Sequence, residues 1–246
     1  MQSCDGSTTR EIENLVKKFY DGHPDTRITC EAVEGSPWVE LLKRSKKEKV
    51  DLIIMRKRLG DKSSGTLVTK LARRAPCSVL FVPEGVKAWY KNILVPIDFS
   101  KNSEDAMEVA IAFAQASKIN EISCPHVYSV PPGFYKTGKS YEQFAEIMKG
   151  HAEKNFKEFM KKINLKGITA VPKFRLDDKD ARGIWEEILE KHEVHLLIMG
   201  ARGRKAGAGV LLGSVTDHLI KTTTVPLIAV KEKGTGMGLF DALLKL

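Results

Sequence analysis

Short apolar runs alternate with longer amphipathic stretches in the last two thirds of the chain. The apolar runs have the length and composition of strands and lie at 92–97, 122–130, 169–175, 195–199 and 226–231. Between them, apolar residues recur every three or four positions, which predicts helices at 103–117, 141–163, 181–192 and 215–222. Strands alternating with helices are typical of parallel βαβ units. The pattern therefore predicts an α/β fold with a doubly wound, five-stranded parallel sheet.

The first third of the chain gives a shorter pattern of the same kind. Helical spacing covers 9–20, 38–47 and 65–74, and apolar or alternating runs predict strands at 27–33, 51–55 and 78–82. Three strands would bury little surface by themselves. We therefore expect this part to pack against the rest of the chain.

Two stretches of the chain resemble each other. Asp51–Met55 parallels His195–Met199 at an offset of 144 residues, and Val79–Val82 parallels Leu227–Val230 at an offset of 148. This indicates an internal duplication whose first copy lacks the first strand, first helix and second strand of the second. The predicted division is a truncated copy at 1–86, a complete copy at 87–232, and a remainder at 233–246.

The remainder has its own pattern. Glycines dominate 233–238, as in a flexible linker, and 239–246 has the spacing of a short amphipathic helix. We expect that helix to cover an apolar groove of this chain or of a partner.

Composition narrows the class of protein. The net charge is +9, with 16 Lys and Arg against 12 Asp and Glu in residues 1–86 and 24 against 19 in the rest. This spread, without interleaved aromatics, argues against nucleic acid as a partner. The beginning of the sequence has no leader-like pattern and no stretch is long enough to span a membrane, so we expect a cytoplasmic protein. No two of the four cysteines have CxxC spacing, and Cys30, Cys77 and Cys124 are expected to be small buried residues in strands.

The strongest chemical signal lies between the predicted strand 195–199 and the helix that follows. Gly200 and Gly203 come directly after that strand, and Gly213 and Ser214 stand where the helix begins. Glycines let backbone amides approach an anion, and a helix N-terminus adds unpaired donors and a positive dipole. The segment is a candidate phosphate-binding loop.

Asp98 follows the strand 92–97 and is expected at the same edge of the sheet as Gly200. Ligands of parallel sheets bind outside the carboxyl ends of the strands. A carboxylate there accepts hydrogen bonds from a ribose hydroxyl or an exocyclic amine. The alternative is that Asp98 caps the following helix or fixes its own turn. Together with the glycine loop, ligand contact is the favoured interpretation.

The run Ile93–Ser100, the pair His126-Val127 and the spacing Gly200-x2-Gly203-x9-Gly213-Ser214 resemble the universal stress protein family. The resemblance covers the second copy completely and the first in truncated form. It implies a five-stranded parallel sheet, a role in stress response, and binding of ATP (or ADP or AMP), with Mg²⁺ as a possible companion. It also implies dimerisation across the last strand, which in a tandem chain would set Val79–Val82 beside Leu227–Val230.

The resemblance also implies roles for individual positions. Asp98 would contact the nucleoside, the Val127 backbone would contact the adenine edge, and the glycine loop and helix start would hold ribose and phosphates. The implied binding residues are Pro96, Ile97, Asp98, Val127, Met199, Gly200, Arg202, Gly203, Gly213, Ser214 and Val215.

Some positions depart from the family pattern. The first copy has Arg56 and Leu59 at the positions equivalent to Gly200 and Gly203, so no nucleotide is expected there. Pro125 interrupts the second strand of the second copy and predicts a bulge that shifts Val127. Asp180, in Asp178-Lys179-Asp180, is interpreted as the N-cap of the helix 181–192.

The sequence offers little for catalysis. Asp98 is the one evident carboxylate at the predicted site, there is no Walker-type Gly-Lys-Ser/Thr, and the six histidines form no ligand-spaced cluster. Any ATP hydrolysis is expected to be slow, and no catalytic or metal-binding residue is predicted. Two other hypotheses stay open: an interaction scaffold without nucleotide, whose tandem copies mediate assembly with a protein partner or further copies, and an adenine-nucleotide hydrolase relative.

Overall fold

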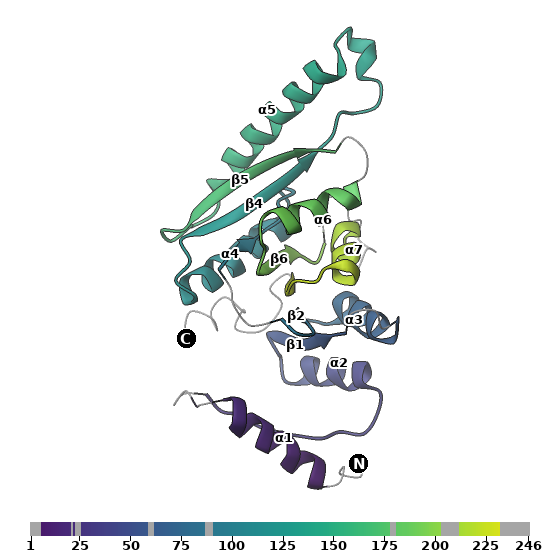
Figure 1. Cartoon of the computed structure of the whole chain (residues 1–246), viewed down its shortest axis with the longest axis vertical. Helices are drawn as coiled ribbons and strands as arrows, with labels where there is room; N and C mark the ends of the chain where they lie inside the picture. The colour runs from purple at the N-terminus through teal and green to yellow at the C-terminus, as the bar shows by residue number, and fades with distance from the viewer. Residues whose placement is uncertain are drawn as a thin grey trace.

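The computed structural model of the chain describes residues 6–20, 22, 26–58, 62–86, 91–177, 181–202 and 212–231. Within these ranges, seven strands form one sheet in the order β1-β2-β7-β6-β3-β4-β5 (Figure 1). The strands are β1 Leu52–Lys57, β2 Ser78–Pro83, β3 Ile93–Leu94, β4 Glu121–Tyr128, β5 Thr169–Leu176, β6 Leu196–Gly200 and β7 Leu227–Val230. Neighbouring strands are parallel except β2 and β7, which are antiparallel.

Helices cover both faces of this sheet, as a doubly wound fold requires. The helices are α1 Gly6–Phe19, α2 Pro37–Lys47, α3 Lys62–Arg74, α4 Lys101–Ala116, α5 Tyr141–Met160, α6 Ala181–Lys191 and α7 Ser214–Thr222, with a 3₁₀ turn at Phe134–Thr137. One apolar core joins α3, α6 and α7 to one face, and a second joins α4 and α5 to the other. Strand residues alternate between these cores: Leu197 and Met199 belong to the first, Leu196 and Ile198 to the second. The predicted α/β fold is confirmed.

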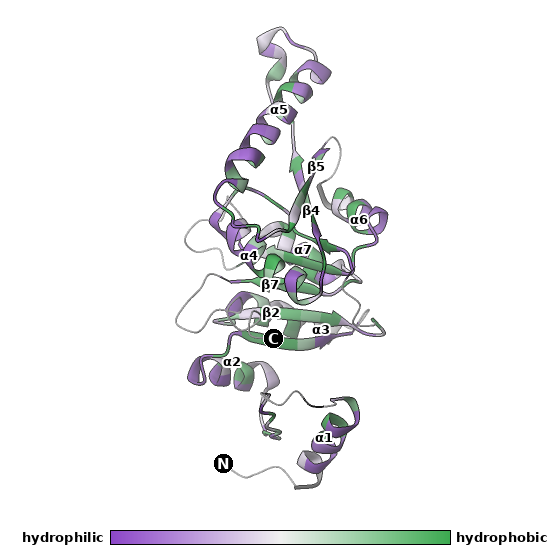
Figure 2. Ribbon diagram, turned by 90° about the vertical axis from the view of Figure 1, so that its left-hand side faces the viewer, coloured by the Kyte–Doolittle hydropathy of each residue, from purple (hydrophilic) through white to green (hydrophobic). Residues whose placement is uncertain are grey.

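The strand expected at 27–33 does not form. Residues 26–34 have no regular secondary structure, and Ile28 and Val33 are exposed. Alternation predicts a strand only where a sheet edge is available to pair with it, and this stretch does not pair with β1. The stretch comes after α1, which both views place apart from the sheet (Figures 1 and 2), and before α2.

Strand β4 corrects a second expectation. It runs without a bulge across Pro125, and its register with β5 is continuous from Glu121 to Tyr128. The proline instead affects the pairing of β4 with its other neighbour, β3. Val95 and Ile97 donate to the carbonyls of Ser123 and Pro125 at 2.8 and 2.9 Å, but proline has no N–H to return a bond to β3. This explains why β3 has two residues where the sequence predicts six.

The cysteines follow the expectation in part. Cys77 and Cys124 are buried and free, and burial raises the pKa of the Cys124 thiol to about 12, which makes it unreactive. Cys30 is half-buried and lies in the irregular stretch, so it is not a core strand residue. In the part of the chain described, no helix is long and apolar enough to cross a membrane.

The antiparallel pairing of β2 with β7 joins the first third of the chain to the rest. Val79, Leu80 and Phe81 pair with Ala229, Ile228 and Leu227, which confirms the expected neighbourhood of these two strands. We call this junction the seam. Polar contacts of three side chains reinforce it: Lys57 Nζ donates to the Thr223 carbonyl at 2.9 Å, Arg73 pairs with Asp217 at 2.9 Å, and Lys231 Nζ donates to the Arg73 and Ala75 carbonyls at 3.0 and 2.7 Å.

The helix expected at 239–246 and the expected N-cap role of Asp180 lie outside the described residues.

The buried Lys57 generates a prediction about stability and pH. Burial lowers its pKa from the ordinary 10.5 to about 8, so between these values the unfolded chain binds more protons than the folded one. Stability therefore rises with pH in that window. We expect Lys57→Met to reduce this slope by up to about 1.4 kcal/mol per pH unit in urea unfolding. Lys43→Met, at an exposed lysine paired with Glu40, is the control and leaves the slope unchanged. Identical slopes in Lys57→Met and the unsubstituted chain would contradict the prediction.

Candidate functional site

A cavity of about 480 Å³ opens at the carboxyl ends of β3, β4 and β6. Its walls come from these strand ends, from the N-terminus of α7, and from one side of α5. The strand order reverses between β3 and β6, which is where ligands of doubly wound sheets bind. The cavity brings together ten of the eleven residues predicted from the sequence: Pro96, Ile97, Asp98, Val127, Met199, Gly200, Arg202, Gly213, Ser214 and Val215. Gly203, the eleventh, lies outside the described residues.

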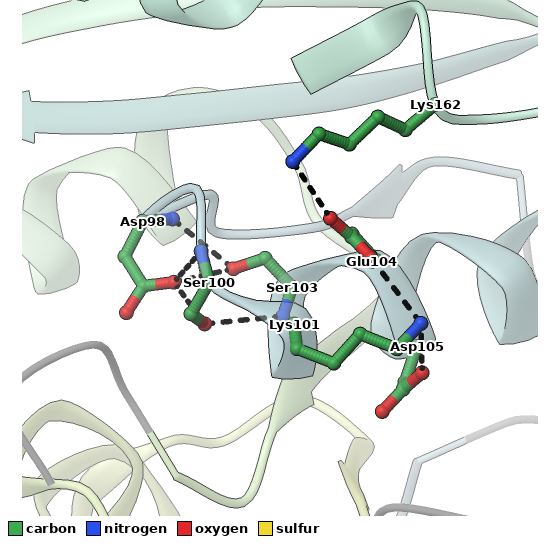
Figure 3. Close-up of polar contacts among 7 residues, drawn as sticks. All are labelled: Asp98, Ser100, Lys101, Ser103, Glu104, Asp105 and Lys162. Carbon is green, nitrogen blue, oxygen red and sulfur yellow. Dashed lines mark hydrogen bonds and ion pairs between the residues drawn. The ribbon is translucent and has the colours of Figure 1, made fainter.

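Asp98 fixes the turn between β3 and α4 (Figure 3). Its Oδ1 accepts from the Ser100 amide at 3.0 Å, the Ser100 hydroxyl at 2.5 Å and the Ser103 hydroxyl at 2.7 Å. Ser103 Oγ in turn accepts from the Asp98 amide at 3.1 Å. The N-cap of α4 is Ser100, so Asp98 holds the turn but is not the cap. Asp98 therefore fixes its own turn, as the alternative interpretation of the sequence held, and it also lines the cavity.

The start of α4 is also tied to its surroundings through charge. Lys101 Nζ lies 3.2 Å from both Glu104 and Asp105, and Glu104 lies 3.3 Å from Lys162 beyond the end of α5 (Figure 3). Between these contacts the turn contains Phe99 at φ 65°, a left-handed conformation that costs energy for a side chain of this size. The contacts around Asp98 stabilise that conformation.

Gly200, at the end of β6, lies against the first turn of α4. A Cβ built on it would lie 2.6 Å from Asn102 Cβ and 2.9 Å from the Asn102 carbonyl oxygen. No side chain larger than hydrogen fits without moving the helix backbone. The glycine predicted to approach a ligand thus has a packing role as well: it lets α4 close onto the strand end.

Helix α7 begins at the cavity with its first amides directed out of the helix. Its N-cap is Gly213, which has no side chain to cap them. The amide of Gly213 donates to the Ala201 carbonyl at 2.8 Å, and Thr216 Oγ1 donates to the Gly200 carbonyl at 2.9 Å. These two bonds hold the helix start against the end of β6. The amides of Ser214, Val215 and Thr216 are those that an α-helix leaves without intrahelical partners.

His126 and its neighbour Phe99 form a further part of the cavity wall. The His126 ring donates from Nδ1 to the Ile97 carbonyl at 2.7 Å, since a carbonyl only accepts, and this sets its tautomer. Its ring centroid lies 4.4 Å from that of Phe99. The pairing fixes β4 against the β3 end at the level of Val127. Next to it, burial raises the pKa of Tyr128, which therefore stays neutral near pH 7.

Several cavity residues were not predicted. Asp177 follows β5 as Asp98 follows β3, and its amide donates to the Tyr128 carbonyl at 2.7 Å, so its position after a predicted strand could have marked it. Met148, His151, Ala152 and Asn155 form one face of α5, and their helical spacing is visible in the sequence. Which strand ends that face covers depends on the packing of α5, which the spacing does not specify. Trp185 of α6 completes the apolar lining.

The described residues contain no group of three or more His, Cys, Asp or Glu side chains that could hold a metal ion. Asp98 and Asp177 are the carboxylates among the described lining residues.

Comparison with known proteins places this geometry in context. Residues 90–231 match the model of the universal stress protein family. Universal stress protein MJ0577 of Methanocaldococcus jannaschii is 32% identical over 161 residues, which are 59% of this chain and 98% of that protein. A second protein of that organism, universal stress protein MJ0531, is 30% identical over 145 residues, covering 58% of this chain and 83% of its own length.

Solved structures extend the comparison. The MJ0577 structure superposes with a TM-score of 0.50 at 26% identity, covering 59% of this chain and 99% of that one. A Pseudomonas aeruginosa structure described as a universal stress protein covers all of this chain and 82% of its own, with a TM-score of 0.65 at 15% identity. The second likeness concerns the fold alone, and it includes the first third of this chain.

The tight contact at Gly200 generates a prediction. Gly200→Ala is expected to lower the free energy of unfolding by about 1–3 kcal/mol, because its Cβ overlaps the α4 backbone. Gly150→Ala is the matched control: it lies in α5 with open space around its Cα and should raise stability by roughly 0.5–1 kcal/mol. Chemical denaturation of both variants checks the pair. Equal changes in the free energy of unfolding at the two positions would show that the contact between Gly200 and α4 does not require glycine.

Proposed function

The chain belongs to the universal stress protein family, and on that premise we propose that its cavity binds ATP, with ADP or AMP as related ligands. The observation that carries the proposal is the convergence of an uncapped helix start, a glycine-lined strand end and Asp98 on one cavity of about 480 Å³. ATP binding is known for some members of the family. Family membership supports a role in stress response.

The phosphates are proposed to lie at the start of α7. The amides of Ser214, Val215 and Thr216 supply donors, and the helix dipole favours negative charge at this end. Ser214, with its hydroxyl, and the exposed Arg202 also line the cavity. Gly200 and Gly213 allow the ligand to approach the backbone closely.

The nucleoside is proposed to lie toward β3 and β4. Asp98 presents a carboxylate at the β3 end, and the Val127 backbone offers hydrogen-bonding groups to an adenine edge. Met199 and Trp185 give apolar surface for a base. Because the Asp98 turn and the Phe99–His126 pair already fix this wall, binding would require little rearrangement.

Mg²⁺ is proposed to arrive with the nucleotide, because it is bound in proteins by one or two carboxylates together with phosphate oxygens. Asp98 and Asp177 are the described carboxylates in reach of that role. When bound, the ion would neutralise phosphate charge. Turnover of the bound nucleotide is proposed to be slow, because the sequence has no Walker-type Gly-Lys-Ser/Thr to position the phosphates for transfer.

We propose further that residues 1–86 are a shortened copy of the same unit that binds no nucleotide. The order β1–α3–β2 repeats the order β6–α7–β7, with parallel strands in both. Where the second unit has Gly200, the first has Arg56, whose side chain pairs with Glu84. The protein is proposed to be cytoplasmic and to act through a protein partner or a further copy of itself.

Direct titration tests the nucleotide proposal. We expect calorimetry with ATP, in the presence and absence of Mg²⁺, to give one site per chain. Ser214→Glu should weaken ATP binding by at least about tenfold, because its carboxylate occupies the helix amides and repels the phosphates. The same substitution places an acid in the first turn of α7 and should not lower stability.

Ser214→Gln is the matched control, with the same size and no charge, and should weaken binding less. Equal ATP affinity in all three proteins, or no binding and no thermal shift at millimolar Mg-ATP, would refute the proposal. The second of these results would favour the scaffold without nucleotide.

A further inference from the structure

A second cavity, of about 420 Å³, lies at the seam on the other side of Arg202. Its charged lining comes from three separate segments: Arg73 and Arg74 end α3, Arg202 follows β6, and Lys231 follows β7. Asn102, in the first turn of α4, adds a side-chain amide. No acidic residue occurs among the described residues that line it.

Two of the four cations are fixed by the fold. Lys231 Nζ donates to the carbonyls of Arg73 and Ala75 at the end of α3, and Arg73 pairs with Asp217 of α7 at 2.9 Å. Arg74 lies beside an aromatic ring, with its Cζ 5.9 Å from the Trp38 ring centroid. Among the residues described, no carboxylate pairs with Arg74 or Arg202. These two guanidiniums are therefore the donors that remain for an external anion.

The assembly of these cations has an electrostatic cost. Burial is the main cause, and the nearby charge of Arg202 the second, that lowers the pKa of Lys231 to about 8. The folded protein thus holds like charges together in a partly dehydrated place, where a bound anion would relieve their repulsion. Arg73, Arg74 and Arg202 line the cavity together with Lys231. The neighbouring Cys77 thiol would favour the charged lysine only as a thiolate, and burial raises the pKa of that thiol.

We propose that the seam cavity is a second anion site, which binds a small phosphate-bearing molecule. Guanidinium groups bind phosphate through paired N–H donors, and two of them with an ammonium behind match the several oxygens of a phosphate better than a single carboxylate. The cavity is large enough for two linked phosphates. The site is separate from the nucleotide cavity, although Arg202 lines both.

Inorganic pyrophosphate is the probe, titrated by calorimetry at constant ionic strength. Because pyrophosphate could also enter the proposed nucleotide site, the titration uses Ser214→Glu as the parent protein. Adding Arg74→Gln to that parent is expected to weaken pyrophosphate binding at least tenfold, since Arg74 lines the seam cavity and not the other one. Adding Arg44→Gln, an exposed arginine of α2 outside both cavities, is the matched control and should change nothing. Unfolding curves confirm that all three proteins are folded.

Pyrophosphate binding that survives Ser214→Glu and is lost with Arg74→Gln establishes the site. No binding by the Ser214→Glu protein at ~10 mM pyrophosphate overturns the proposal, and so does equal binding with and without Arg74. These outcomes are independent of the nucleotide proposal, which is decided by ATP titration of the unsubstituted chain. If ATP fails to bind and pyrophosphate binding depends on Arg74, the seam site stands alone.

Discussion

The pairing of β2 with β7 is the constraint on which the rest of the structure depends. It is antiparallel in a sheet whose other pairs are parallel, and it joins two βαβ units across three paired positions. Everything that crosses the seam depends on this register: Lys57 reaches the Thr223 carbonyl, and Lys231 reaches the end of α3. A shift of one residue would turn Leu80 and Phe81 to the wrong faces and remove both contacts.

The cavity of the candidate site stays open because the contacts that hold its walls in place lie around it and do not fill it. The Asp98 turn, the approach of Asn102 to Gly200 and the bond from Gly213 to Ala201 all hold walls in place. Each uses backbone or short side chains, which leave room between the strand ends. The pre-formed wall also means that the structural role and the proposed binding role fall on the same residues. Substitutions that preserve the walls, such as those at Ser214, are for that reason more informative than changes at Asp98 or Gly200.

The hydrophobic pattern of the sequence was sufficient to predict the helices and strands that bury a continuous face. The βαβ order, the neighbourhood of the last strands and the gathering of Asp98, Gly200 and Gly213 follow from strand order and from which strand ends share an edge. The failures have tertiary causes. Residues 27–33 alternate but pair with no edge, and Pro125 shortens its neighbour β3 without bending its own strand. The α5 face with His151 and Asn155 was visible as a spacing, yet what it covers is decided by packing against β4 and β5.

The first third of the chain depends on the seam for its stability. Its part of the sheet contains two strands, and an isolated pair of strands is marginal in water. Ile53, Val79 and Phe81 share one core with Leu227 and Ala229, so the burial that stabilises the first unit is completed by the second. The cost of that dependence is the gathering of Lys57 and Lys231 in partly dehydrated positions. The partly dehydrated positive charge of these lysines is also what a bound anion would stabilise, which is why the proposed anion site lies at the seam.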